Sequence, residues 1–166
     1  LISGGSGELL TRLNAEKAKP RADVLVGPDA DNFDAYLDLF EGYKSKEDAA
    51  FPRSAVGPDN KYYGFSTNFQ AFIVNTKMMP LDKAPQTWND LTKPGLAIVT
   101  PDPASSGGGI WNRCALYGAA LRGYVGTPRN DIVAARDFLT RVESNVVDRR
   151  ASASESFRSF LAGTGD

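Results

Sequence analysis

The residues best suited to chemistry in this chain are small and hydroxyl-bearing, and they lie where an apolar run gives way to a helical pattern. The run at residues 96–99 is followed by Ser105, Ser106 and three consecutive glycines that begin at Gly107. The first amides of a helix lack intrahelical partners and carry the positive end of the helix dipole, and glycine lets a ligand approach them closely. The sequence therefore predicts an anion-binding helix start at this position.

Two further helical patterns begin in the same way. Ser6 and Gly7 precede a segment whose leucines fall on one helical face, and Ser152 and Ser154 precede a segment with phenylalanines at helical spacing. One such helix start is common, but three in a chain of 166 residues indicate a ligand cleft. A structural alternative stays open for two of them, because Ser6 and Ser152 are also ordinary capping residues and Glu155 completes a capping box with Ser152.

Most sequence signatures of catalysis are absent, because the chain lacks the residues that they require. The chain has no histidine and a single cysteine, which removes histidine-assisted nucleophiles, multi-cysteine metal sites and an internal disulfide. No Gly-Lys pair precedes a serine or threonine, as a P-loop requires, and Leu10 replaces the third glycine of a dinucleotide fingerprint. One alternative stays open, in which Asp29 and Asp102, each placed after an expected strand, do acid–base work. We expect no cofactor and no metal site.

Length and charge restrict the class of protein. With 166 residues, 42% of them hydrophobic, and a net charge of −1, the chain is typical of a soluble globular body of one domain or two small lobes. This charge argues against nucleic acid as a partner. No apolar run reaches the about 20 residues that span a bilayer. The chain begins at Leu1 without a methionine, and we interpret it as a mature or trimmed product.

The apolar patterns predict an α/β protein with two lobes. Four short apolar runs bounded by turn residues are expected to be strands: residues 22–28, 64–76, 96–99 and 145–147. The second run is long enough to leave one lobe and enter the other, which places the lobe boundary near Ala71. We therefore expect a partial first lobe at residues 1–71 and a second lobe at residues 72–166.

The helices expected between these strands bury apolar stripes. One begins at Asp31 or Asn32 and ends near residue 41, and a short one follows Thr87, which with Asp90 approximates a capping box. Two longer helices are predicted to bury one stripe each. The stripes comprise Ile110, Cys114, Tyr117 and Leu121 in the first helix, and Ile132, Ala135, Leu139 and Val142 in the second. Trp88 is expected to belong to the core, and Cys114 to serve packing alone.

Three arginines lie close in sequence to the expected helix starts. Arg113 follows the glycine loop, and Arg149 and Arg150 precede Ser152. They could neutralise a doubly charged ligand, although a solvated position is the simpler interpretation.

A series of motifs resembles a known family in order as well as in content. The motifs are Gly5-Ser6-Gly7-Glu8-Leu9-Leu10, Ala22-Asp23-Val24, Tyr63-Gly64-Phe65, Asn75-Thr76, Thr87-Trp88-Asn89-Asp90-Leu91 and Pro103-Ala104-Ser105-Ser106-Gly107. From about Ser3 onward, the chain resembles an extracellular solute-binding protein of an ABC importer. Within that superfamily it is similar to the branch that includes ferric-iron-binding proteins and the binders of phosphosugars, phosphonates and polyamines.

The resemblance implies a two-lobed α/β fold of the type II periplasmic-binding-protein kind, with one lobe nearly complete and the other partial in this chain. Each lobe would be a sheet with helices on both faces, and a small anionic or oxyanion-bearing solute would bind between the lobes. Carried over by position, the ligand-binding residues would be Ser6, Gly7, Ser66, Thr67, Ser105, Ser106, Gly107, Ser152 and Ser154. The protein would be a monomer in the periplasm or, in a Gram-positive source, at the cell surface. It would deliver its solute to the membrane permease subunits of the importer.

Two departures from the family keep alternatives open. Relatives are longer at both ends, so the chain resembles a fragment or a body completed by partner chains. Relatives that bind ferric ion use a tyrosine pair in a C-terminal region, often with an N-terminal histidine, whereas Tyr62 and Tyr63 lie in the wrong segment. The alternatives are a ferric-ion binder with its metal ligands elsewhere, an enzyme that uses Asp29 or Asp102 on a phosphorylated or carboxylated substrate, and a lobe that self-associates through an exposed apolar face.

Overall fold

The computed structural model describes residues 1–166, which form two compact units, Leu1–Phe69 and Gln70–Asp166. The division falls close to the lobe boundary expected near Ala71. We call the two bodies unit 1 and unit 2 and describe each by itself. None of their helices combines the length and the apolar character that a membrane crossing requires.

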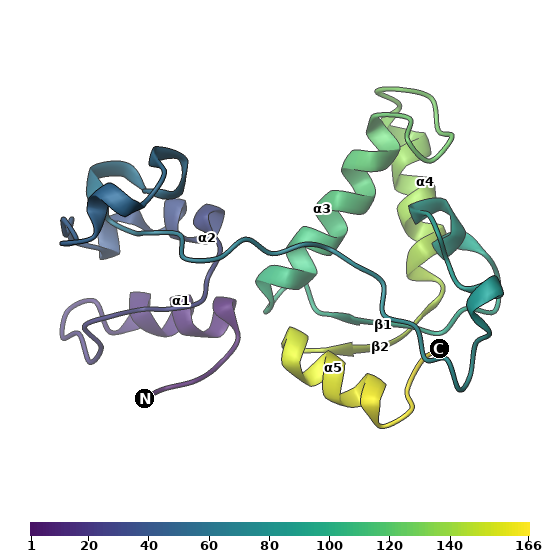
Figure 1. Cartoon of the computed structure of the whole chain (residues 1–166), viewed down its shortest axis with the longest axis horizontal. Coiled ribbons are helices and arrows are strands. Elements are labelled where there is room, and N and C mark those ends of the chain that lie inside the picture. Colours follow the sequence, from purple (N-terminus) through teal and green to yellow (C-terminus); the bar gives the residue numbers. More distant parts are fainter. The chain divides into compact units, whose positions relative to one another are not determined.

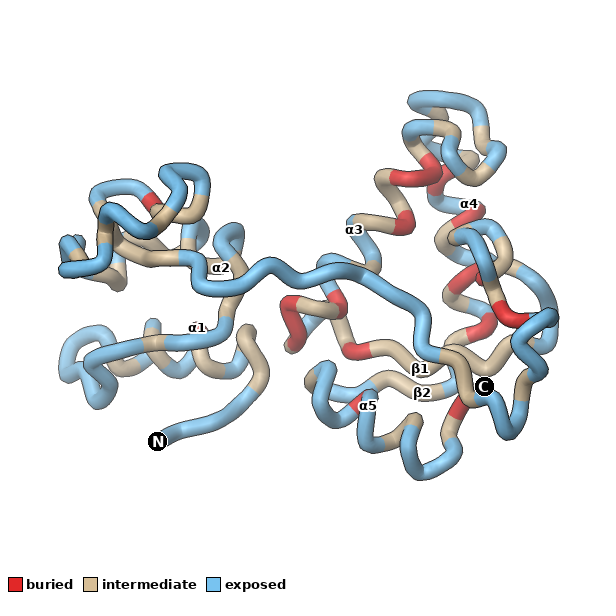
Figure 2. Tube along the Cα trace, in the orientation of Figure 1, coloured by how far each residue is buried: buried red, intermediate tan, exposed pale blue.

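Unit 1 consists of short helices joined by irregular chain (Figure 1). Its α-helices are α1, Ser6–Ala15, and α2, Ala30–Asp34. Its 3₁₀ helices are Leu37–Leu39, Asp48–Ala50, Arg53–Ala55 and Pro58–Asn60. Only Leu10 and Gly57 are buried, and Figure 2 shows this part of the chain almost entirely as exposed or intermediate. Burial of apolar surface therefore contributes little to the stability of unit 1.

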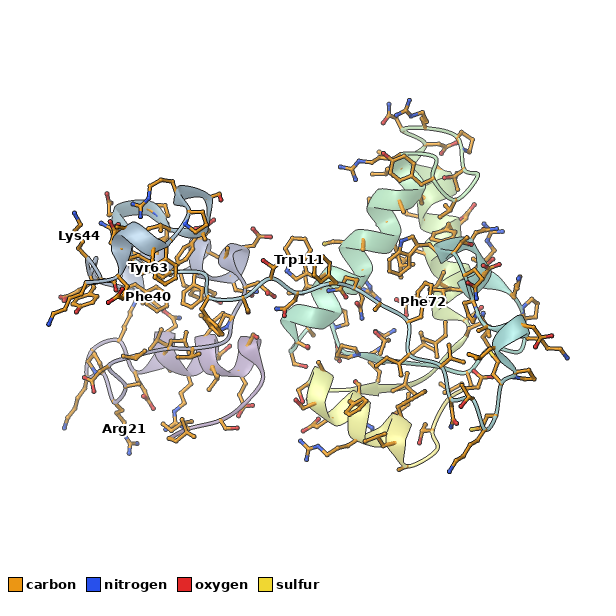
Figure 3. The ribbon with its side chains drawn as sticks, in the orientation of Figure 1. Arg21, Phe40, Lys44, Tyr63, Phe72 and Trp111 are labelled. Carbon is orange, nitrogen blue, oxygen red and sulfur yellow. The ribbon has the colours of Figure 1, made fainter.

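Aromatic rings hold the later half of unit 1 together. The centroid of the Phe33 ring lies 5.2 Å from that of Phe40 and 5.2 Å from that of Tyr62. Tyr63 packs edge-on against Phe51 at 5.0 Å, and Figure 3 shows Phe40 and Tyr63 within this cluster of side chains. Such pairs contribute beyond their buried area, which partly replaces the missing aliphatic core.

Two strands expected from the sequence are absent, so these two predictions were wrong. Residues 22–28 and 64–76 form no strand, and Phe69 is 87% exposed. A strand is stabilised by a neighbour that pairs with its backbone and packs against its side chains. Unit 1 offers only one isolated antiparallel bridge, between Val56 and Tyr63. Apolar and β-branched residues without such a neighbour remain irregular chain.

The helix expected from Asp31 to residue 41 is interrupted. Helix α2 ends at Asp34, and only the 3₁₀ turn Leu37–Leu39 follows it. Between them Tyr36 has φ −132° and ψ 26°, which lie outside the helical region. The helical spacing of apolar residues therefore continues across an interruption of the helix.

Unit 2 is built on two parallel strands, β1, Ile98–Pro101, and β2, Val146–Arg150, with Ile98 paired to Val146 and Pro101 to Arg150. Parallel strands need a crossover connection. Here the crossover carries helices α3, Gly107–Leu121, and α4, Ile132–Glu143, which pack on each other (Figure 1). Helix α5, Ala153–Leu161, follows β2 and packs against both strands. The 3₁₀ helices are Leu81–Lys83 and Trp88–Thr92.

The core of unit 2 lies between α3, α4 and the 3₁₀ helix Trp88–Thr92. Its members are Leu91, Leu116, Ala120, Ala135, Phe138 and Val142, and Figure 2 shows the buried segments gathered on these helices. Phe138 is fully buried. Trp88 packs against this cluster, as predicted, and Phe72, labelled in Figure 3, meets the Trp88 ring edge-on with a centroid distance of 5.0 Å.

The stripe predicted for the first long helix was partly wrong. Ile110 is 42% exposed and Cys114 is exposed, whereas Leu116, Ala119 and Ala120 are buried. The buried face of α3 is thus rotated from the predicted one, because packing against α4 selects the side with small residues. The prediction that Cys114 serves packing alone was wrong for the same reason.

The stripe predicted for α4 was also partly wrong. Ala135 and Val142 are buried as expected, but Ile132 is 53% exposed and Phe138 takes the central buried position.

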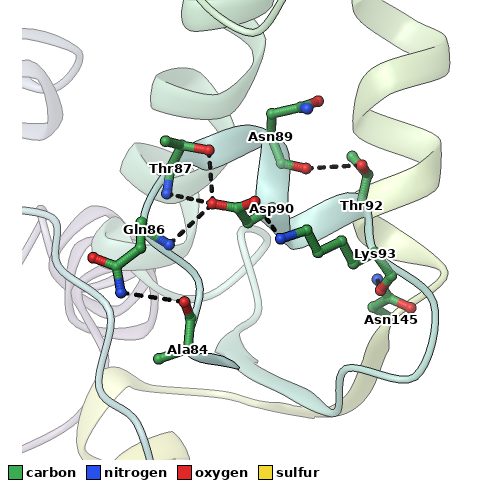
Figure 4. A network of polar contacts seen from close by, with 8 residues as sticks. All are labelled: Ala84, Gln86, Thr87, Asn89, Asp90, Thr92, Lys93 and Asn145. Atoms are coloured by element: carbon green, nitrogen blue, oxygen red, sulfur yellow. Dashed lines mark hydrogen bonds and ion pairs between the residues drawn. The ribbon is translucent and has the colours of Figure 1, made fainter. Parts of the chain in front are cut away.

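A polar network fixes the short helix before β1 (Figure 4). The predicted capping box is confirmed: the Asp90 carboxylate accepts hydrogen bonds from the backbone N–H groups of Thr87 (2.8 Å) and Gln86 (3.0 Å). Lys93 adds an ion pair with an Nζ–Oδ1 distance of 2.7 Å. The Lys93 ammonium, followed by the Thr87 hydroxyl, lowers the pKa of Asp90 well below its usual value.

Candidate anion-binding site

A tight turn carries the chain from β1 into α3. The Asp102 carbonyl accepts hydrogen bonds from the amides of Ser105 (3.2 Å) and Ser106 (2.8 Å), and the Asp102 carboxylate accepts one from the amide of Ala104 (2.8 Å). Aspartate commonly stabilises a turn in this way. Asp102, a candidate base in the enzyme alternative, therefore has a structural task in this turn.

The first turn of α3 presents free hydrogen-bond donors. Ser106 is the N-cap residue, yet its side chain makes no capping hydrogen bond, although the residue is only 6% exposed. No backbone carbonyl accepts a hydrogen bond from the amides of Gly107, Gly108 or Gly109. The first turn holds no acidic residue. Unpaired amides at the positive end of a helix dipole attract anions.

The glycines of this turn are required for different reasons. A Cβ atom at Gly109 would lie 2.7 Å from the carbonyl oxygen of Pro101, so only glycine fits against the end of β1. A Cβ atom at Gly108 would make only ordinary contacts, at 3.7 Å from Ser106 Oγ and 3.8 Å from Ala153 Cβ. A methyl group would therefore fit at Gly108 without displacing its neighbours.

The start of α5 lies beside the start of α3. The Cβ atom of Ala153 lies 3.8 Å from the position that a Cβ atom would take at Gly108. The Ser105 hydroxyl donates a 2.8 Å hydrogen bond to the carbonyl of Ala151. Both helices follow the carboxyl ends of the parallel strands β1 and β2 (Figure 1). In open α/β sheets this edge is where ligands bind.

The start of α5 is satisfied by its own residues. The Ser152 hydroxyl accepts a hydrogen bond from the amide of Glu155 at 3.2 Å, and Glu155 places a carboxylate in the first turn. Ser154 is exposed. The capping interpretation of Ser152 therefore agrees with the geometry, and the negative charge of Glu155 opposes an anion at this helix start.

The arginines near these helix starts are each paired with a carboxylate. Arg149 forms an ion pair with Glu143, and Arg113 reaches the other oxygen of the same carboxylate at 2.9 Å. Arg150 pairs with Asp148 at 2.8 Å. A hydrogen bond from Ser159, followed by the one from Arg150, lowers the pKa of Asp148. Each guanidinium group is thus held by a carboxylate of the protein, and Glu143 is shared by two of the three arginines.

The remaining sequence-predicted residues lie in unit 1. Ser6 and Gly7 open α1, but Glu8 lies in the same first turn, and a Cβ atom at Gly4 would be 2.7 Å from its carboxylate. Ser66 and Thr67 lie exposed in irregular chain. Within unit 2 the structure brings Ser105, Ser106, Gly107, Ser152 and Ser154 to one edge of the sheet.

Sequence reasoning included Gly108 and Gly109 in the glycine-rich loop, although it carried only Gly107 over as a ligand residue, and it missed Ala151 at this edge. The Ala151 carbonyl had no signal, because any residue presents the same backbone group.

A metal centre has little support in either unit. No group of three or more cysteine, aspartate or glutamate residues lies close enough to hold a metal ion. The Tyr62 hydroxyl donates a 2.9 Å hydrogen bond to Asp34, and burial, followed by this interaction, raises the pKa of Tyr62. The Tyr62 hydroxyl is therefore already engaged by a side chain of its own unit.

Unit 2 is an α/β unit: two parallel strands are joined by a crossover of two helices, and a glycine-rich helix start lies at the strand ends. Residues 1–165 match the family model of the bacterial extracellular solute-binding proteins. The chain belongs to this family, which has the two-lobed type II periplasmic-binding-protein fold.

Three similar proteins illustrate the relationship. The sulfate-binding protein of Escherichia coli K12 is 41% identical over 80 residues, which cover 48% of this chain and 23% of that protein. A putative 2-aminoethylphosphonate-binding periplasmic protein of Salmonella typhimurium is 32% identical over 111 residues, which cover 64% of this chain and 31% of that protein. The periplasmic binding protein AfuA of Actinobacillus pleuropneumoniae, solved with fructose-6-phosphate bound, matches 99% of this chain and 52% of its own, with 26% identity and a TM-score of 0.63. The chain thus spans a third or less of these two curated relatives and about half of AfuA.

Proposed function

We propose that this chain is part of a non-catalytic solute-binding protein that captures a small oxyanion-bearing solute, and that the start of α3 holds the oxyanion. One observation carries the proposal: the amides of Gly107, Gly108 and Gly109 have no backbone acceptor, while the N-cap Ser106 leaves them uncapped. A bound oxyanion would accept these hydrogen bonds at the positive end of the dipole.

A comparison of the helix starts supports α3 over the other two. Helix α1 carries Glu8 in its first turn and α5 carries Glu155, whereas α3 carries no acid there. An acidic side chain in the first turn satisfies the dipole internally and repels an anionic ligand. We therefore assign Ser152 to capping, and we assign Ser106 and Gly107 to the ligand.

The ion pairs of the arginines favour recognition by neutral donors. Arg149 and Arg150 are paired with carboxylates of their own unit, so the ligand charge is stabilised by amide dipoles and by the Ser106 hydroxyl. Amides and hydroxyls directed at an oxyanion form charge-assisted hydrogen bonds, which are stronger than neutral ones. A sulfate, phosphonate or phosphate-ester group has the oxygens to accept them.

The names of the related proteins agree with this ligand class. They bind sulfate, aminoethylphosphonate and fructose-6-phosphate, and this set favours oxyanion capture over the ferric-ion alternative. By the same relationship we propose that the protein is a monomer in the periplasm or at the cell surface, and that it delivers its solute to the permease subunits of an ABC importer. We expect no turnover of a phosphate ester, because Asp102 is used in the turn before α3 and Asp29 is the N-cap residue of α2 in unit 1.

Isothermal titration calorimetry of the 166-residue chain with sodium sulfate tests the proposal, with sodium chloride at equal ionic strength as the reference. Gly108→Ala adds a methyl group next to these amides while keeping every N–H group. We expect at least about tenfold weaker sulfate binding, because the methyl group hinders the approach of the anion and costs it about one charge-assisted hydrogen bond. Gly118→Ala in the same helix is the matched control, because its methyl group meets only the mobile end of Arg122. Equal sulfate affinities for both variants would exclude the start of α3 as the site.

A further inference from the structure

The hydroxyl of Ser105 is directed at protein rather than at a ligand. It donates a 2.8 Å hydrogen bond to the carbonyl of Ala151, a residue 46 positions later in the chain. A serine hydroxyl has one proton to donate, and an oxyanion requires donors. In this arrangement Ser105 therefore supplies nothing to an anion, although its sequence position beside Ser106 favours direct contact.

The bond joins the two connections that leave the sheet at one edge. Ser105 lies in the turn between β1 and α3, and Ala151 lies between β2 and α5. At the strand ends themselves, the amide of Asp102 donates to the carbonyl of Arg150 at 2.7 Å. The hydrogen bond of Ser105 continues this pairing beyond the strands, into the two turns.

The position of Ala151 makes this bond a determinant of where α5 begins. Ala151 immediately precedes Ser152, the N-cap residue whose hydroxyl accepts from the Glu155 amide. The Cβ atom of Ala153, the first residue of α5, lies 3.8 Å from the position that a Cβ atom would take at Gly108. Movement of the Ala151 carbonyl would therefore move Ala153 relative to Gly108.

We propose that Ser105 is a positioning residue of the anion site: through Ala151 it holds the start of α5 against the start of α3 and so fixes how closely Ala153 approaches Gly108. This inference rests on the proposed function of the α3 start. It predicts that loss of the Ser105 hydroxyl weakens anion binding without removing any group that contacts the anion.

Ser105→Ala and Ser105→Thr form the test pair, since threonine keeps the hydroxyl. Sulfate affinity is measured by calorimetry, and amide hydrogen exchange is measured by NMR in sulfate-free buffer. We expect Ser105→Ala to bind sulfate about fivefold more weakly, which corresponds to one neutral hydrogen bond, and Ser105→Thr to restore most of the affinity. We also expect faster exchange of the Glu155 amide in Ser105→Ala without sulfate, because the start of α5 is less restrained.

The exchange measurement separates positioning from direct contact and from a general loss of stability. Exchange of the amides around Phe138 in the core should stay unchanged, because that region does not depend on this bond. Weaker binding with an unchanged Glu155 amide would make Ser105 a direct ligand donor and overturn the inference. Unchanged sulfate affinity in Ser105→Ala would also overturn it.

A failure of the proposed function gives a different result. If wild-type protein shows no heat of sulfate binding beyond that of chloride, the anion site itself is refuted, and the role of Ser105 is refuted with it. If the wild-type protein binds sulfate, Gly108→Ala weakens this binding and both Ser105 variants bind sulfate as tightly as wild type, the anion site is supported. The positioning role of Ser105 is then refuted.

Discussion

The side-chain amide of Asn145 donates a 2.8 Å hydrogen bond to the carbonyl of Leu91, a residue 54 positions earlier in the chain. The same nitrogen donates to the carbonyl of Lys93 at 2.8 Å, and Asn145 itself is 8% exposed. These bonds fasten the 3₁₀ helix Trp88–Thr92 to the end of α4, directly before β2. A buried polar side chain thereby adds two specific hydrogen bonds to the apolar contacts between these segments.

Asn145→Ala should destabilise the protein by about 1–3 kcal/mol, because the carbonyl of the buried residue Leu91 and the partly buried carbonyl of Lys93 lose their donor. Urea unfolding followed by circular dichroism measures the change in the free energy of unfolding. Asn89→Ala is the matched control, since Asn89 is exposed, and it should change the midpoint little. A stable Asn145→Ala variant would show that water or a rearranged side chain replaces these bonds.

Phe138→Ala should lower the free energy of unfolding by about 3–5 kcal/mol, because the ring is fully buried in the core between α3, α4 and Leu91 and its removal leaves a cavity. Val133→Ala on the same helix is the comparison, since Val133 is 68% exposed. Thermal unfolding of both variants distinguishes them. Similar losses of stability in Phe138→Ala and Val133→Ala would contradict the placement of the buried face of α4.

Neighbouring glycines at the start of α3 should respond in opposite ways to alanine. Gly109→Ala should destabilise by at least about 1–3 kcal/mol, because the new methyl group would meet the backbone of Pro101 and Asp102 at 2.7 Å. Gly108→Ala should be neutral or stabilise by up to about 1 kcal/mol, since alanine favours the helix and the methyl group makes ordinary contacts. Chemical denaturation of both variants gives the comparison, and a reversed order would refute the geometry of this turn.

Acid should weaken the structure around the helix Trp88–Thr92. The pKa of Asp90 is lowered in the folded protein by Lys93 and Thr87, so its carboxylate stabilises the fold above the ordinary aspartate pKa of about 4. That contribution is lost as the pH falls from this value toward the lower folded-state pKa. Urea midpoints measured at several pH values should fall with acid in wild type and fall less steeply in Asp90→Asn. Parallel pH profiles for the two proteins would show that Asp90 is not coupled to folding.

The secondary structure of unit 2 could be predicted largely from sequence because its signals are local. The turn residues before Gly107, the N-cap Asp131 and the capping box at Thr87 each act within a few residues of the helix that they start. The side of α3 that is buried could not be predicted in the same way. Ile110 is exposed and Ala120 is buried because the neighbouring helix determines the contact surface.

The strands of unit 1 were predicted wrongly because pairing is not local. The segment at residues 22–28 has the composition of a buried strand, yet Val24 is 77% exposed and has no strand beside it. In the anion site, the glycine run and Ser106 were visible in the sequence. The bond between Ser105 and Ala151 was not, since it depends on the register of two strands that lie far apart in the chain.

The most direct test of the central claim is a sulfate titration of the isotopically labelled chain, followed through the backbone amide signals. We predict saturable shifts at Gly107, Gly108 and Gly109, downfield in the proton dimension as each amide gains an anionic acceptor, with none of comparable size at Glu8 in α1 or Glu155 in α5. Saturable shifts at either acid-bearing helix start, with the three glycine amides unmoved, would contradict the assignment of the oxyanion to α3.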